Sequence, residues 1–216
     1  MNEESPSVDT ALRAGVALFN EGHALAAHDP WEAAWLPLDG DAADPTEVAD
    51  ERLLHGLIAA AAATHHAQSR NWSGAVGCAD NAVDYLTVVA DDHRGVDTVT
   101  ARDWCRRLAA DPETIERVAP PSLRVEGVAC GFSDLDLSAT LLAAAALAEA
   151  YDRYEESVFE RAAALAREEH GTGKTTFAEL LFAFCRKPET RPQVTARLAD
   201  RVELVDRKRR DVDDLF

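Results

Sequence analysis

Apolar residues recur at helical spacing along nearly the whole chain, from near Val8 to the C-terminus, and this period restricts the chain to α-helices. Alanine supplies much of the hydrophobic content of 47%, whereas aromatic residues make up only 6%. Because alanine has the highest helix propensity and a small side chain, it lets neighbouring helices pack closely. We therefore predict an all-α, multi-helix bundle of about seven to nine helices.

Four predicted helices in the first half form one antiparallel helical domain. The first runs from about Val8 to Glu21, and the second begins near residue 28. The third, from about Val48 to Arg70, carries an apolar stripe and should be central to the core, and the fourth starts after Ser73.

A long segment without helical period divides the chain. Residues 1–118 form the predicted helical domain, residues 119–136 form an irregular connection with two prolines, and residues 137–216 form a C-terminal helical region. In this last region we predict one long helix from Ser138 to about Glu169 and two further helices. We expect these later helices to pack on the first four or to form a small bundle of their own.

The charge balance is strongly acidic, with 39 acidic residues against 22 basic ones and a formal net charge of −17. Only three of the basic residues are lysines. This pattern resembles proteins of halophilic organisms, whose salty cytoplasm shortens the range of charge repulsion. A nucleic acid is excluded as a primary partner, because phosphate binding needs a basic surface. A protein partner or a second copy of the chain remains open.

The sequence predicts a soluble, cytoplasmic protein. The first ten residues lack the charged and apolar regions of a signal peptide, and we find no uncharged apolar stretch long enough to span a membrane. The four cysteines are widely spaced and form no C-x-x-C pair, which predicts reduced, buried thiols. The run from His170 to Thr176 only superficially resembles a phosphate-binding loop, because Glu168 stands where its first glycine would fall; we predict no nucleotide cofactor.

Five of the seven histidines fall between residues 23 and 66. His65 follows Leu54 by eleven positions and therefore returns to the apolar stripe of the third helix, so we expect it to point inward. His66 follows His55 by the same spacing, on a flanking face. An inward imidazole beside carboxylates can ligate a metal or act as a general base. Alternatively, His65 is a core histidine hydrogen-bonded to a neighbour.

The segment from His28 to Trp35 allows two interpretations. An uninterrupted helix would place His28 and Glu32 on one face, where an imidazole and a carboxylate can share a proton or a metal. However, Pro30 disfavours a helix interior. Asp29 at the N-cap, Pro30 at the first helical position and Glu32 at the third would instead start a helix, and we favour this structural role for Asp29.

Several motifs share their order and spacing with a known family. They are Phe19-Asn20-x-Gly22, Ala27-His28-Asp29-x-x-Glu32-x-x-Trp35, Leu54-x-Gly56-Leu57-Ile58, His65-His66 and Asn71-x-x-Gly74-Ala75. Together, over residues 12 to 90, they resemble the family catalogued as domain of unknown function 309. The resemblance implies a small helical domain in which the His28 helix packs beside the helix that carries the later histidines. The chain departs from the pattern at His55, where Gln is expected, at Asp29, where Glu is usual, and at Pro30.

The family has no established activity, and residues 91–216 lie outside the resemblance, so whether the chain is an enzyme stays open. One hypothesis is a metal-binding or hydrolytic site between the second and third helices. Its candidate divalent-metal ligands are His28, Glu32 and His65, and its catalytic candidates also include His66 and Asn71. The alternative is a non-catalytic structural or protein-interaction module in which these residues form a buried polar network.

Overall fold

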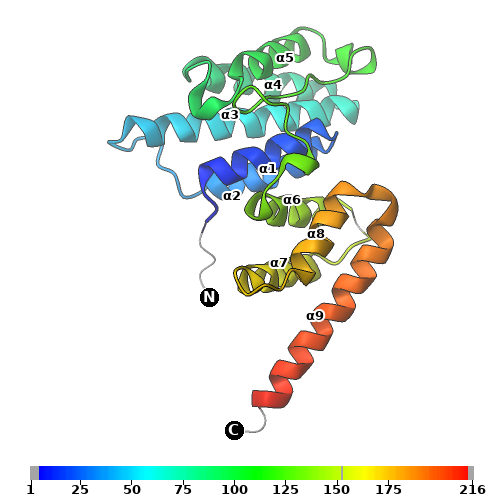
Figure 1. Ribbon diagram of the computed structural model, residues 1–216. Coiled ribbons are helices and arrows are strands. Elements are labelled where there is room, and N and C mark those ends of the chain that lie inside the picture. Colours follow the sequence, from blue (N-terminus) through cyan, green and yellow to red (C-terminus); the bar gives the residue numbers. More distant parts are fainter. Residues whose placement is uncertain (1–4, 152, 214–216) are drawn as a thin grey trace. The chain divides into compact units, whose positions relative to one another are not determined.

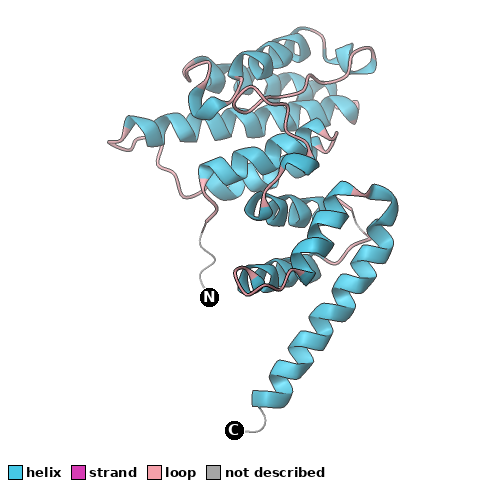
Figure 2. Ribbon diagram, viewed as in Figure 1, coloured by secondary structure: helices cyan, strands magenta, loops and turns pink. Residues whose placement is uncertain are grey.

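The computed structural model describes residues 5–151 and 153–213. Over these residues the chain forms nine α-helices joined by loops and short 3-10 turns, as Figure 2 shows, so the all-α prediction is confirmed. The chain divides into two compact units, Met1–Leu135 and Asp136–Phe216, here called the first and second unit.

The first unit contains five helices, and each packs against the next along the chain (Figure 1). They are α1 (Val8–Asn20), α2 (Ala24–Trp35), α3 (Pro45–Gln68), α4 (Trp72–Thr87) and α5 (Thr98–Ala110). The longest, α3, contacts α2 on one side and α4 on the other, so its central position in the predicted bundle is confirmed.

Two glycines let these helices approach closely. A methyl group at Gly15 of α1 would lie only 2.2 Å from Nε1 of Trp31, a fully buried side chain of α2. A methyl group at Gly56 of α3 would lie 2.6 Å from the side chain of Leu86 on α4. Larger residues at either position would push a helix pair apart, because neither partner is the free end of a flexible side chain.

The start of α2 corrects the sequence prediction. The helix begins at Ala24, and Pro30 lies inside it, so the predicted N-cap at Asp29 is wrong. The proline leaves the carbonyl of Ala26 without its usual donor, at a cost of about 3 kcal/mol. Complete burial of the Trp31 side chain contributes a stabilisation of comparable size, about 2 to 3 kcal/mol. Tertiary packing therefore outweighs the local helix-start signal.

Residues 119–135 form an irregular segment of the first unit, apart from the 3-10 turn Phe132–Asp134. An isolated bridge pairs Val125 with Val96, two residues before the start of α5. The same segment is hydrogen-bonded to α1 by the side chain of Asn20. The segment is thus held by the end of α1 and by the turn before α5.

The second unit contains four helices, α6 (Leu137–Glu149), α7 (Glu156–Glu169), α8 (Thr176–Arg186) and α9 (Arg191–Asp213). The prediction of one helix from Ser138 to Glu169 is wrong, because the helix is interrupted after Glu149. The break lets α7 turn back against α6 and places the ring of Phe159 4.5 Å from that of Phe184 on α8. Aromatic packing in this core compensates for the helical hydrogen bonds lost at the break.

A buried arginine joins α8 to α9. Arg191, only 4% exposed, donates through Nε to the carbonyl of Phe184 and through Nη2 to that of Cys185. Its Nη1 bonds the hydroxyl of Tyr151 at 3.0 Å. The last turn of a helix carries partial negative charge, so the end of α8 compensates the buried guanidinium.

All four cysteines are free thiols; three are buried, and Cys78 is half-buried. Burial raises the pKa of Cys105 and of Cys185 to about 12. Both thiols therefore remain protonated and unreactive at neutral pH. Among the described helices, none combines the length and the apolar character that crossing a bilayer requires.

We predict that the first unit folds without the second. A chain ending at Leu135 retains the five helices, the Asn20 hydrogen bonds and the bridge at Val96, so it should keep a helical circular dichroism spectrum and unfold cooperatively on heating. The measurement compares its thermal transition with that of the full chain in the same high-salt buffer. A broad, non-cooperative loss of helix would contradict the division at this residue.

Candidate functional site

The first candidate group lies on α2 and combines His28 with two carboxylates. Nδ1 of His28 is 3.7 Å from Oδ1 of Asp29 and 3.7 Å from Oε2 of Glu32. The uninterrupted helix thus brings His28 and Glu32 together at the i, i+4 spacing. The three side chains are between 30% and 44% exposed, so the group is open to water on the surface of the first unit.

The environment of His28 favours its protonated form. Contact with Asp29 is the largest cause and, with the negative charge of Glu32, raises the pKa of His28 despite partial burial, which acts in the opposite direction. A protonated imidazole between two carboxylates can donate a proton or attract an anionic group. It cannot ligate a metal until it loses that proton.

His65 does not occupy the core position predicted for it. It is half-buried, and the buried position beside it belongs to Thr64, which donates to the carbonyl of Ala60 and accepts from Nε1 of Trp104 at 2.9 Å. Leu54 lies at the edge of the buried arc of α3, and the eleven-residue step adds about 20°. That small rotation carries His65 past the edge of the core.

His66 and Asn71 meet at the turn between α3 and α4. Asn71 caps α4, because its Oδ1 accepts from the backbone N–H of Gly74 at 3.1 Å. Its Nδ2 lies 3.2 Å from Nδ1 of His66, so the amide donates to that nitrogen and leaves the imidazole proton on Nε2. A methyl group at Gly74 would lie 2.6 Å from Asn71 Nδ2, which explains the glycine of this motif.

Four of the five candidates therefore form two separate pairs, and the fifth, His65, lies beside one of them. His28 contacts Glu32, and His66 contacts Asn71, while the ring of His65 lies 6.0 Å from that of His66, measured between centroids. Among the residues that the structure describes, no three His, Cys, Asp or Glu side chains lie close enough together to hold a metal ion. His28, Glu32 and His65 thus do not assemble into the hypothesised ligand set.

A polar cluster that sequence reasoning missed surrounds Glu51 of α3. Its side chain is nine-tenths buried, and Oε1 accepts from Nε1 of Trp35 at 2.9 Å while lying 3.3 Å from Nδ1 of His55. The ring of His55 stacks on Tyr85 of α4, with centroids 3.9 Å apart, and also contacts Trp35. The i, i+4 spacing of Glu51 and His55 was the available sequence signal.

The second carboxylate oxygen of Glu51 is buried and makes no hydrogen bond with the described residues. Nε of Arg52 lies 3.3 Å away, outside hydrogen-bonding geometry, and the guanidinium of Arg52 also covers the ring of Tyr85. A methyl group at Gly40 would come within 3.3 Å of this oxygen, so the loop after α2 lies over it. Protein atoms therefore cover this oxygen of Glu51.

A second missed cluster anchors the beginning of α3. Asp50 is buried and accepts from Nε and Nη2 of Arg94 at 2.8 and 2.5 Å, and it contacts Nε2 of His93 at 2.7 Å. Burial would raise the pKa of Asp50, but the hydrogen bonds from Arg94 and His93 together hold it below its usual value. The partners are more than 40 residues apart in sequence and carry no shared motif, so no local pattern predicts them.

Asn20 of the Phe19-Asn20-x-Gly22 motif has a structural role. Its Nδ2 donates to the carbonyls of Leu123 and Cys130 at 2.9 and 2.8 Å, and its Oδ1 accepts from the N–H of Leu123 at 2.8 Å. All three bonds join the end of α1 to residues 119–135. Each net bond contributes about 1 kcal/mol, so one side chain fixes this otherwise irregular segment.

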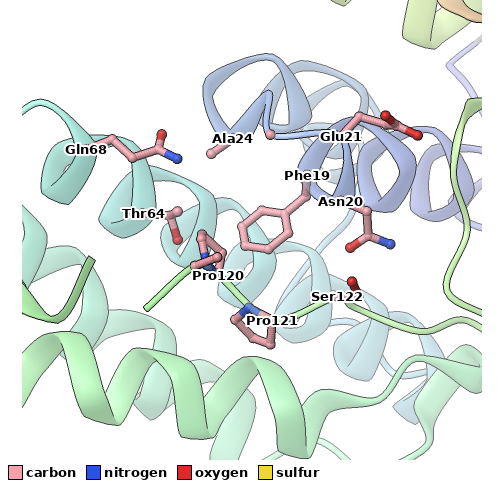
Figure 3. Close-up of a pocket in the computed structure, with 11 residues that line it drawn as sticks. Phe19, Asn20, Glu21, Ala24, Thr64, Gln68, Pro120, Pro121 and Ser122 are labelled. Atoms are coloured by element: carbon pink, nitrogen blue, oxygen red, sulfur yellow. The ribbon is translucent and has the colours of Figure 1, made fainter. Parts of the chain in front are cut away.

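A cavity of about 330 Å³ lies beside this clamp, between the ends of α1 and α3 and the start of the irregular segment. Figure 3 shows the ring of Phe19 directed toward Pro120 and Pro121, with Thr64 and Gln68 on the neighbouring helix. The lining residues are Phe19, Asn20, Glu21, Gly22, Ala24, Thr64, Gln68, Ala119, Pro120, Pro121 and Ser122. Residues 12–90, which carry the family resemblance, are here called the family-like region. The cavity therefore joins one motif of this region to a segment outside it.

Comparison with known proteins supports the family resemblance over part of the chain. Residues 12–78 match the model of a family described as Domain of unknown function (DUF309). The match runs from α1 into α4 and leaves α5, the irregular segment and the second unit uncovered. No curated protein and no solved structure matches the chain.

We predict that His28 makes stability depend on pH. Because its pKa is raised in the folded state, protonated His28 stabilises the fold below the unfolded pKa, near 6.5, and this contribution is lost as pH rises through the higher folded value. His28→Gln should reduce the free energy of unfolding by roughly a few tenths of a kcal/mol at about pH 5.5, and by less at about pH 8.5. Urea unfolding at both pH values measures the difference.

The matched control for this experiment is His170→Gln, which replaces an exposed histidine at the end of α7. It should leave the free energy of unfolding unchanged at both pH values. An effect of His28→Gln that is larger at high pH would show that the sign of the linkage is wrong.

Proposed function

We propose that the chain is a non-catalytic helical module in which the polar residues of the family-like region fix helix packing and carry out no reaction. The observation that carries this proposal is the burial of Glu51 with its partners Trp35 and His55 inside the first unit. A catalytic or metal-binding carboxylate needs access to its ligand, whereas Glu51 is enclosed by Gly40, Arg52 and its bonded partners.

The energetics of the Glu51 cluster support a role in specifying one packing arrangement. A buried carboxylate with one unbonded oxygen is costly to desolvate, so an apolar side chain would give similar or greater stability. A polar group in such a place selects the one arrangement that satisfies it. Here it sets the register of α2 against α3, because Trp35 and Glu51 must meet.

The other motif residues also have structural roles. Asn20 holds residues 119–135, Asn71 caps α4, and Gly56 and Gly74 provide the space for neighbouring side chains. Each of these motif residues is already hydrogen-bonded or packed against a neighbour within the first unit. The proposal thus explains these motifs without a reaction.

A second candidate function, a metal-binding or hydrolytic site, is favoured by one observation, the contact of His28 with Asp29 and Glu32. These side chains can transfer a proton, but their exposure to water weakens every electrostatic effect on a substrate. We place this candidate second, because His28, Asp29 and Glu32 do not form a group that could hold a metal ion, and all three side chains are open to water.

We predict that replacement of a glutamate by alanine lowers the free energy of unfolding much more at Glu51 than at Glu32. Glu51→Ala leaves the indole N–H of Trp35 without an acceptor and opens a buried gap, so it should lower the free energy of unfolding by about 2 to 4 kcal/mol. Glu32→Ala removes an exposed carboxylate and should change it by less than about 0.5 kcal/mol. Denaturant unfolding measures both, and equal effects would argue against a structural role for the Glu51 cluster.

Elemental analysis separates the two candidate functions. Protein purified in high salt, without chelator, should contain no stoichiometric transition metal, and His28→Ala and His65→Ala should leave the metal content unchanged. About one equivalent of metal in the wild type, lost in either variant, would overturn the proposal in favour of the metal site.

We further propose that the protein works in a salty cytoplasm. The first unit has 23 acidic residues against nine basic ones, a net charge of −14 within the total of −17. At low ionic strength these charges repel one another across a compact surface, and salt shortens the range of that repulsion to about 3 Å at 1 M.

We predict that the melting temperature rises as KCl increases from about 0.2 to about 3 M. The exposed carboxylates of Asp80 and Asp84 lie one turn apart on α4 and repel each other. The double substitution Asp80→Asn, Asp84→Asn should therefore raise the melting temperature more at low salt than at high salt. Differential scanning calorimetry measures both effects, and a melting temperature independent of KCl would contradict the proposal.

A further inference from the structure

One exposed face of α9, the longest helix of the second unit, carries a row of cations (Figure 1). Arg197, Arg201 and Lys208 follow one another at spacings of four and seven residues, which keep side chains on one side of a helix, and Leu204 lies between the last two. The three cations are exposed, and Leu204 is half-buried. These four residues are here called the basic stripe.

The cations of the basic stripe form no ion pair within the part of the chain that the structure describes. α9 uses another face to pack within the second unit, where Val194 and Leu198 are buried and Asp206 forms an ion pair with Arg161 of α7. In a chain with 39 acidic residues against 22 basic ones, a row of unpaired cations is an exception. The stripe is therefore a surface whose charge is not used inside the chain.

A row of opposite charge lies on the exposed face of α4. Ser73, Gly77, Asp80, Asp84 and Val88 follow helical spacing, and all five residues are exposed. A methyl group at Gly77 would meet no atom within 4 Å, so this face is open there. The side chain of Val88 is 72% exposed, which leaves a large apolar group in water beside the carboxylates. These five residues are here called the acidic stripe.

Each stripe contains like charges that repel one another. Asp80 and Asp84 lie one turn apart on α4, and Arg197 and Arg201 lie one turn apart on α9. Like charges at this spacing destabilise a helix, and neither pair is neutralised by an ion pair with a described residue. Contact between the two stripes would place each like-charged pair against its opposite and relieve both repulsions.

The two stripes match in length as well as in sign. With a rise of about 1.5 Å per residue, Asp80 to Val88 covers about 12 Å of α4, and Arg197 to Leu204 covers about 10.5 Å of α9. When the helices run parallel, the two carboxylates therefore face the two arginines, and Val88 covers Leu204. Lys208, about 6 Å further along, then reaches the last carbonyl groups of α4, which carry partial negative charge.

We propose that the protein associates with a second copy of itself, with the basic stripe of one copy against the acidic stripe of the other. The occupant follows from charge, because the basic stripe requires an acidic helix and the first unit of this chain carries a net charge of −14. When each copy supplies one stripe to the other, the contact forms twice and the pair is closed. This partner goes beyond the non-catalytic role proposed above, because it names what the helical module binds.

Salt favours this association in spite of its ionic character. Two copies of net charge −17 repel each other at long range, and about 1 M salt limits that repulsion to about 3 Å. Ion pairs in direct contact lie at about that distance, so they keep part of their attraction. The contact is small, and we therefore expect weak association, with a dissociation constant on the order of 0.1 mM.

A nucleic acid fits the basic stripe less well than a second copy does. The net charge of −17 repels a polyanion, and Leu204 in the stripe offers no partner to a phosphate. Phosphate binding also weakens steeply in high salt, whereas the contact of Val88 with Leu204 does not depend on charge.

Sedimentation equilibrium of the full chain tests the proposal. The weight-average mass is measured from about 0.02 to about 1 mM protein in about 1 M KCl, and it should rise above the 23.4 kDa of one copy as the concentration increases. Asp84→Arg and Arg201→Asp should each weaken the association by at least about tenfold, because like charges then meet. Both positions are exposed, so both variants should keep the helical circular dichroism spectrum of the wild type.

A mixture of the two variants should associate again. In a mixed pair, one contact joins the arginine introduced by Asp84→Arg to the aspartate introduced by Arg201→Asp. The other contact keeps both original residues. A contact formed within a single chain would not be restored by mixing, so this step assigns the contact to two copies.

The matched control is Glu113→Arg, which reverses an exposed carboxylate of the first unit outside α4. This variant and Asp84→Arg both raise the net charge of −17 by two. If net charge alone governed association, both variants would associate more strongly than the wild type. The proposed contact instead requires that Asp84→Arg loses association and that Glu113→Arg keeps it.

Three results would each overturn the proposal. They are a wild type that stays a single copy up to about 1 mM, equal behaviour of Asp84→Arg and Glu113→Arg, and a mixture that associates no better than its two components. A wild type that stays a single copy but binds a DNA oligonucleotide through Arg201 would assign the basic stripe to a polyanion. None of these outcomes bears on metal content, which tests the non-catalytic role independently.

Discussion

The three hydrogen bonds of Asn20 are the constraint on which the irregular half of the first unit depends. They attach residues 119–135 to the end of α1 and satisfy backbone groups of Leu123 and Cys130 that no helix or sheet pairs. With that segment in place, Val125 can bridge Val96 before α5, and the two prolines close one wall of the cavity. A short polar side chain thus organises a segment that has almost no secondary structure of its own.

The sequence predicts the helices of the first unit well because their apolar periods are long, but it misplaces the start of α2. The signal of Asp29 and Pro30 is local and concerns single hydrogen bonds, whereas the preceding alanines and Trp31 gain burial against α1 and α3. The same limit explains His65. A rotation of about 20° along α3 decides whether a side chain enters the core, and a spacing rule does not resolve that difference.

The candidate site was predicted in part. The contact of His28 with Glu32 and the role of a motif at Asn71 follow from spacing within one element or one turn. The hydrogen bond of Glu51 was not predicted, because its partner Trp35 lies on another helix. The pair of Asp50 and Arg94 is beyond any single-sequence argument, since the two residues meet only after the chain between them has folded.

The family match ends at residue 78, whereas the cavity continues beyond it. The matched region supplies Phe19 and Gln68, at the ends of α1 and α3. The unmatched segment supplies Pro120 and Pro121, which add apolar rings to the wall. The cavity therefore depends on the hydrogen bonds by which Asn20, inside the matched region, holds a segment outside it.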